Sequence, residues 1–189
     1  MKKVWMLLLL LAPMTAWAGD LMLDNGSSAV SFVSVKKGSV GEVHHFTRLS
    51  GEAGAHEASV MIDLASVESG IDIRNERMRS LLFNVAKFAS ATIRADISSM
   101  DVQNLKAGEQ KSGSLMVEVA LHGVVKQLPA SVSVVRLKDG GLLVNSRAPV
   151  IVKAADFGLD SGIEALRHVA KLPSIATAVP VTFELHFIH

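Results

Sequence analysis

Apolar and polar residues alternate along three segments of the chain, 92–98, 114–122 and 179–187. A period of two is typical of a β-strand that buries one of its faces. The apolar positions are Ile93, Ala95 and Ile97 in the first segment, Leu115, Val117, Val119 and Leu121 in the second, and Val179, Val181, Phe183, Leu185 and Phe187 in the third. We therefore predict three strands whose apolar faces contribute to a core.

Weaker strand patterns and two helical patterns occupy much of the remaining chain. The further strand candidates are 29–35, 43–49, 58–63, 130–137, 142–145 and 149–153, and the helix candidates are 72–85 and 161–172. Residues that favour turns separate these segments, and the Asp139-Gly140 pair is typical of a tight β-hairpin.

This order of elements predicts an all-β fold with two short helices. About nine short strands, each with one apolar face, favour an antiparallel sheet that closes into a barrel of about eight strands, because closure removes exposed edges. A β-sandwich is the structural alternative. A barrel of this size is either filled by its own side chains or has room for one small ligand, and the alternation is the same in both.

The first 18 residues have the pattern of a secretory signal peptide. A basic start at residues 2–3 precedes an apolar run over 4–12, and residues 16–18 read Ala-Trp-Ala, the small-x-small form of a cleavage site. The apolar run is shorter than the roughly 20 residues that a spanning helix needs. We predict a signal peptide over 1–18, one domain over 19–189, and a periplasmic or secreted protein.

Removal of the signal peptide changes the composition of the chain. The full sequence has 19 Lys and Arg against 18 Asp and Glu, and Lys2 and Lys3 leave with the signal, so the mature formal charge is −1. No basic surface for nucleic acid or for an anionic membrane is indicated. The sequence has no cysteine, which excludes thiolate nucleophiles and thiolate metal sites. Both tryptophans, Trp5 and Trp17, lie in the signal, and the sequence has no tyrosine.

Four stretches follow one another along most of the mature chain. They are Ile62-Asp63-Leu64-Ala65-Ser66-Val67, then Ile71-Asp72-Ile73-Arg74-Asn75-Glu76-Arg77-Met78-Arg79-Ser80-Leu81-Leu82-Phe83, then Gly113-Ser114-Leu115 with Leu121-His122-Gly123-Val124, and finally Asp156-Phe157-Gly158-Leu159. As an ordered set they resemble the YceI family of exported lipid-binding proteins. The sequence departs from the family pattern at Asn75, where an Asp is usual, at 125–128 and at 153–155, which indicates a divergent subfamily.

The resemblance implies a lipocalin-like, up-and-down barrel with an inner apolar cavity. It also implies a periplasmic protein that binds a polyisoprenoid chain, such as an isoprenoid quinone or an isoprenyl phosphate. The candidate ligand-binding residues are Leu115, Val117, Val119, Leu121, Val181, Phe183, Leu185, Phe187, Phe32, Phe83, Phe157 and Arg74. For the apolar residues the alternative role is packing in a filled core, and for Arg74 it is a structural contact between helix and barrel.

No pattern for a metal site or for catalysis stands out. His44 and His45 are adjacent, and neighbours on a strand point to opposite faces, so the two rings cannot readily share one ion. No Gly-x-Ser-x-Gly or His-Glu-x-x-His motif is present.

We therefore expect a non-enzymatic binding protein with an apolar small-molecule ligand. The expectation includes no metal, no cofactor other than a bound isoprenoid lipid or quinone, no nucleic-acid partner and no stable membrane insertion. The alternatives are a filled barrel that acts as an interaction module of the cell envelope, and a small-molecule enzyme. The sequence leaves the oligomeric state open, a homodimer included.

Overall fold

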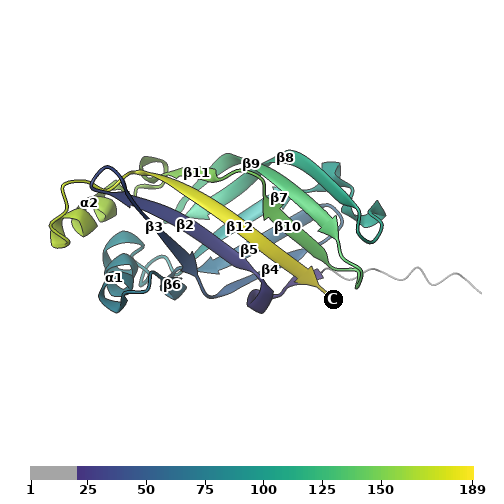
Figure 1. Ribbon diagram of the computed structural model, residues 1–189, viewed down its shortest axis with the longest axis horizontal. Coiled ribbons are helices and arrows are strands. Elements are labelled where there is room, and N and C mark those ends of the chain that lie inside the picture. Colours follow the sequence, from purple (N-terminus) through teal and green to yellow (C-terminus); the bar gives the residue numbers. More distant parts are fainter. Residues whose placement is uncertain (1–20) are drawn as a thin grey trace, which may run out of the picture.

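One antiparallel sheet, bent round until its ends meet, makes up most of the molecule (Figure 1). The computed structural model describes residues 21–189, so the predicted signal peptide at 1–18 lies outside the described residues. Both α-helices lie at the same end of the sheet. In residues 21–189, no helix has the length and apolar composition needed to cross a bilayer.

The sheet has twelve strands. They are β1 (Leu21–Leu23), β2 (Ala29–Lys36), β3 (Val40–Phe46), β4 (Leu49–Ala53), β5 (Glu57–Asp63), β6 (Val67–Glu68), β7 (Ser90–Asp96), β8 (Gln110–Leu121), β9 (Val124–Arg136), β10 (Leu142–Ser146), β11 (Val150–Lys153) and β12 (Ala178–Ile188). The helices are α1 (Asp72–Arg77), which continues into a π-helical turn over Met78–Leu82, and α2 (Asp160–Val169).

The pairings reduce these strands to eight positions around a barrel. β1 and β2 both pair with β12, on the same side, and β4 and β3 pair with β1 and β2 in turn. β1 and β2 therefore form one barrel strand that a turn interrupts, and β4 and β3 form another. The same holds for β5 with β6 and for β10 with β11. Together with β7, β8, β9 and β12 they form a closed, antiparallel, up-and-down barrel. The predicted fold class is confirmed.

The two ends of the barrel are built differently. One end carries α1, α2, and the turns between β2 and β3 and between β8 and β9 (Figure 1). At the opposite end, the β7–β8 connection contributes Ile97, Met100 and Val102, which are buried in the same core as the strands. Arg136 of β9 donates from Nη2 to the carbonyl oxygen of Val102 at 2.7 Å and holds this connection in place. One end is thus packed with side chains, and the other is covered by helices.

α2 packs closely against the backbone of the π-helical turn. Gly162 of α2 is buried, and a Cβ at this position would lie 2.8 Å from the carbonyl oxygen of Leu81 and 2.8 Å from the Cα of Leu82. The segment after α2 is anchored to the β2–β3 hairpin, because the Lys37 amide donates to the Ser174 carbonyl oxygen at 3.1 Å. The two helices and this hairpin are therefore joined around one end of the barrel.

The short strands β1 and β6 were not predicted. Three of the predicted elements also differ from the structure for reasons that its contacts show. The segment 43–49 is two strands, because the amides of Thr47 and Arg48 donate to the backbone oxygen and the hydroxyl of Ser66 and leave the ladder. β9 begins at Val124, ahead of the predicted start at 130. The tight turn at His122-Gly123 allows residues 124–129 to pair directly with β8. The predicted helix over 72–85 is α-helical only to Arg77.

Substitution of Gly162 by alanine tests the contact between α2 and the π-helical turn. In an unhindered helix this change stabilises by up to about 1 kcal/mol. Here the added methyl group meets backbone atoms, so we expect Gly162→Ala to lower the free energy of unfolding by about 1–3 kcal/mol. Chemical denaturation measures the change, with Ser161→Ala at the exposed neighbouring position as the control. A Gly162→Ala variant as stable as the control would show that the contact is not tight.

Candidate functional site

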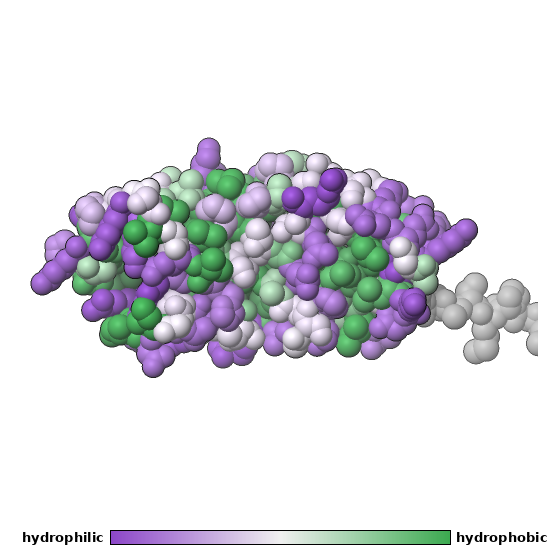
Figure 2. Space-filling view, viewed as in Figure 1, coloured by the Kyte–Doolittle hydropathy of each residue, from purple (hydrophilic) through white to green (hydrophobic). Residues whose placement is uncertain are grey.

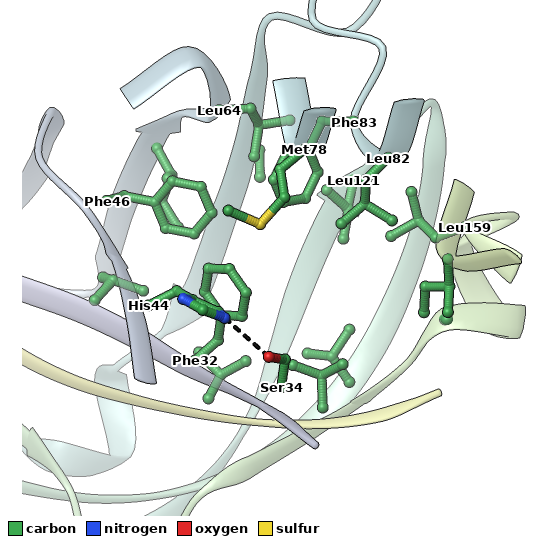
Figure 3. A pocket seen from close by; sticks show the side chains of 18 of the residues that line it. Phe32, Ser34, His44, Phe46, Leu64, Met78, Leu82, Phe83, Leu121 and Leu159 are labelled. Atoms are coloured by element: carbon green, nitrogen blue, oxygen red, sulfur yellow. Dashed lines mark hydrogen bonds between the residues drawn. The ribbon is translucent and has the colours of Figure 1, made fainter. Parts of the chain in front are cut away.

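The inward strand faces enclose a cavity of about 510 Å³ in the helical half of the barrel (Figure 3). Most of the strand residues that line it are apolar: Val30, Phe32, Phe46, Val60, Ile62, Ala91, Ile93, Val117, Val119, Leu121, Leu128, Ala130, Val150, Val152, Val179, Val181, Phe183 and Leu185. This half of the barrel is hollow. The alternation of apolar and polar residues alone could not distinguish a hollow barrel from a filled one.

The cavity reaches the surface between α1 and the end of α2. Ile71, Ile73 and Ala170 all line it, and all three are exposed, Ile73 to 58%. Hydrophobic surface lies among hydrophilic side chains at the end of the molecule that carries α1 (Figure 2). The opening, which we call the mouth, is therefore framed by apolar side chains.

The π-helical turn supplies part of the inner wall. The Phe83 amide donates to the Met78 carbonyl oxygen at 2.9 Å, five residues back, which widens the helix at this point. As a result Met78, Leu82 and Phe83 all face the cavity, and the Phe83 ring lies 5.9 Å from that of Phe46 (Figure 3).

Charged side chains gather on the cavity wall near the mouth. The Glu42 carboxylate accepts from Lys36 Nζ at 2.8 Å and, through the same oxygen, from Arg74 Nη1 at 2.9 Å. The hydrogen bond from Lys36, followed by the charge of Arg74, holds the pKa of Glu42 below its usual value. Arg77 also lines the cavity, so among the described lining residues three cations face a single carboxylate. The mouth carries a net positive charge.

A neutral polar pair lies further along the same hairpin. The Ser34 hydroxyl and His44 Nε2 are 2.8 Å apart, and both residues line the cavity (Figure 3). His44 is only 2% exposed and its ring lies 5.2 Å from that of Phe32. Burial, and next the charge of Arg74, lower the pKa of His44, so the imidazole is neutral at pH 7.

Comparison with known proteins identifies the family of this barrel. The YceI-like domain model matches residues 21–187. The chain belongs to the YceI-like family. No protein with a curated description matches it.

Three solved structures resemble this YceI-like protein. A polyisoprenoid binding domain from Saccharophagus degradans, implicated in plant cell wall breakdown, is 40% identical, with a TM-score of 0.85 over 88% of this chain and 97% of that one. BcnA of Burkholderia cenocepacia is 19% identical, with a TM-score of 0.63 over 87% and 98% of the two chains. The YceI protein of Campylobacter jejuni is 15% identical, with a TM-score of 0.50 over 76% and 82%. The last two similarities support the fold alone.

The structure places nine of the twelve candidate residues on the cavity wall. These are Phe32, Arg74, Phe83, Val117, Val119, Leu121, Val181, Phe183 and Leu185. It does not bring Leu115, Phe157 or Phe187 to the cavity. Leu115 and Phe187 lie toward the packed end, where Phe187 pairs with Leu142, and Phe157 is fully buried in the turn before α2. Sequence reasoning missed Ser34, Lys36, Glu42 and His44 as cavity residues.

Asn75, where this YceI-like chain departs from the family pattern, braces α1 and does not face the cavity. Its side chain is 2% exposed, its Oδ1 accepts from the amide and the hydroxyl of Ser69 at 2.9 and 2.6 Å, and its Nδ2 donates to Glu68 at 2.9 Å. An Asp carboxylate in this place would have no N–H for Glu68. The departure therefore bears on how α1 is attached to β6.

The remaining candidates for polar chemistry are structural in this YceI-like barrel. His44 is buried and His45 is exposed, so the adjacent histidines point to opposite faces. Within the part of the chain that the structure describes, no three His, Asp or Glu side chains gather as a metal site would require. Arg79 donates from Nε to the Ala65 carbonyl oxygen at 2.7 Å and so ties the π-helical turn to the sheet.

The lowered pKa of His44 gives this protein a pH-dependent stability. The unfolded chain binds this proton more readily than the folded chain does, so stability falls as the pH drops below about 6.5, until the folded-state pKa is passed. We expect His44→Gln, which removes the titrating group, to lose less free energy of unfolding between pH 7.5 and pH 5.5 than the wild type. His45→Gln, at the exposed neighbour, is the control and should lose as much as the wild type. Equal losses in all three proteins would contradict the assignment.

Proposed function

We propose that this protein holds the apolar chain of a polyisoprenoid or an isoprenoid quinone inside its barrel, as a non-catalytic carrier or sink. The observation that carries the proposal is the apolar cavity of about 510 Å³ that opens beside α1. Small-molecule sites of 300–1,000 Å³ typically have apolar walls and a few polar groups. The described ligand class of the 40% identical Saccharophagus degradans domain supports an isoprenoid.

The wall matches the chemistry of such a chain. A branched hydrocarbon makes no hydrogen bonds, and its burial contributes roughly 25 cal/mol per Å² of apolar surface. Aliphatic and Phe side chains supply the contact and exclude water. An apolar cavity of about 150 Å³ suffices to bind benzene, so a cavity of about 510 Å³ accommodates a chain of several isoprene units.

The distribution of charge favours one orientation of the ligand. Lys36, Arg74 and Arg77 lie near the mouth with Glu42 as the one acidic lining residue described, whereas the strand wall beyond Phe32 is apolar. The oxygen-bearing end of the ligand therefore points to the mouth, and its apolar tail points toward the packed end. Arg74 both contacts the head and ties α1 to β3 through Glu42.

A non-catalytic role fits the geometry of the Ser34–His44 pair in the cavity. A Ser–His pair is a competent nucleophile when a third group orients the base. Here His44 Nδ1 is buried and has no hydrogen-bond partner among the described residues, so the imidazole lacks that third group. The Ser34–His44 pair is accordingly a binding feature.

We also propose that the chain acts in the periplasm after loss of residues 1–18. The signal pattern supports export. In the aqueous compartment between two membranes, a barrel with an enclosed lumen keeps a bound isoprenoid out of water.

Extraction of the protein tests the ligand directly. We expect protein purified from its native envelope to release an isoprenoid lipid or quinone into organic solvent, identified by mass spectrometry. Since the mature chain has neither Trp nor Tyr, a quinone would also dominate its ultraviolet spectrum. Repeated recovery of protein without lipid, together with no binding of added isoprenoids, would contradict the proposed function.

A bulky residue on the wall tests the location of the ligand. Val119 of β8 faces the cavity, and Met116 of the same strand is 57% exposed on the outer face. We expect Val119→Trp to abolish most isoprenoid binding while destabilising the fold by less than about 1 kcal/mol, because the indole enters open space and does not overpack a core. Met116→Trp should bind as the wild type does. Unfolding of Val119→Trp would show that the lumen has no room for a ligand.

A further inference from the structure

The inner face of the β2–β3 hairpin changes from apolar to polar inside the cavity. In the register of the hairpin Phe46 lies opposite Val30, His44 opposite Phe32, and Ser34 opposite Glu42, whose ion pairs continue toward the mouth. The Ser34–His44 pair therefore lies between the apolar wall and the charged mouth. When a ligand fills the lumen, the junction between its apolar tail and its polar head lies beside the Ser34–His44 pair.

The position of the imidazole proton follows from burial. His44 Nδ1 is buried and has no hydrogen-bond partner among the residues that the structure describes. A buried N–H without an acceptor is costlier and rarer than an acceptor with a lone pair unused. The neutral ring therefore carries its proton on Nε2 and donates it to Ser34 Oγ, 2.8 Å away.

This arrangement leaves the Ser34 hydroxyl proton free. Within residues 21–189, the bond with His44 is the one hydrogen bond that the Ser34 side chain makes. With the imidazole proton on Nε2, Oγ is the acceptor in it. A hydroxyl can donate once while it accepts. An unused donor on an apolar wall has a cost that an acceptor atom of the ligand removes.

We propose that the Ser34 hydroxyl, positioned by His44, donates a hydrogen bond to an oxygen atom of the ligand at the junction of tail and head. This inference rests on the proposed function and deepens it, because it names the ligand class as isoprenoids that carry an acceptor oxygen there. The oxygen is the carbonyl of a quinone or the ester oxygen of a prenyl phosphate. Pure isoprenoid hydrocarbons bind less well.

Three probes of similar chain length separate these ligands. Farnesylacetone carries a carbonyl, farnesyl phosphate carries a phosphoester, and farnesene has no oxygen. We expect Ser34→Ala to weaken binding of one or both oxygen-bearing probes by roughly three- to tenfold, the effect of one neutral hydrogen bond. Binding of farnesene should stay unchanged. The probe that responds identifies the source of the oxygen.

Conservative variants separate positioning from packing. Ser34→Thr keeps the hydroxyl and should keep the preference for oxygen-bearing probes. His44→Phe keeps the ring volume but cannot orient Ser34, and we expect it to lose that preference while it still binds farnesene. Circular dichroism confirms that each variant is folded.

The possible failures are distinguishable. Wild-type protein that binds none of the probes would overturn the proposed function and this inference with it. Binding of all three probes with no change in Ser34→Ala would overturn the inference alone. An equal loss for all three probes in Ser34→Ala would mean that the substitution damages the cavity, and it would likewise overturn the role of the hydroxyl.

Discussion

The side chains that point into the helical half of the barrel are too small to fill it, and the other features of the molecule depend on this packing constraint. Inward positions there include many valines and some alanines, such as Val119, Ala91 and Ala130. Toward the other end, Phe187, Leu142 and Met100 fill the same cross-section. An eight-stranded barrel is just wide enough for its side chains to close it. The size of the inward side chains therefore decides where the lumen begins.

The polar groups of the cavity are arranged by increasing charge toward the mouth. Val30 and Phe46 face each other first, the neutral Ser34–His44 pair reaches from the level of Phe32 to that of Glu42, and Glu42 binds two cations there. Each group is paired within the protein, which limits the cost of placing it on an apolar wall. Such a gradient suits an amphipathic molecule in one orientation only. Specificity thus comes from the order of a few residues along one hairpin.

The fold was predictable from the sequence, but the polar half of the site was not. Alternation identified β8, β12 and part of the apolar wall, because many outward residues of those strands are polar. Ser34 lies in the predicted strand 29–35 and Lys36 follows it, and the sequence analysis singled out neither, although both share the spacing of two with Phe32. The orphaned nitrogen of His44 and the approach of Gly162 to the π-helical turn depend on contacts between distant segments. A single sequence contains no signal for such contacts.

Closure of the barrel joins the two ends of the described chain. β1 pairs with β12 through Met22 opposite Ile188 and Leu23 opposite Phe187. The closing pair therefore joins strands far apart in the sequence, and pairings of such separation are slow to form because the loop-closure entropy must be overcome first. Until then every residue of the future lumen is exposed to water on an open sheet. The barrel has an inside only when β12, the eleven residues Ala178–Ile188, is in place. Removal of this strand would open the barrel although most of the residues that line it would remain.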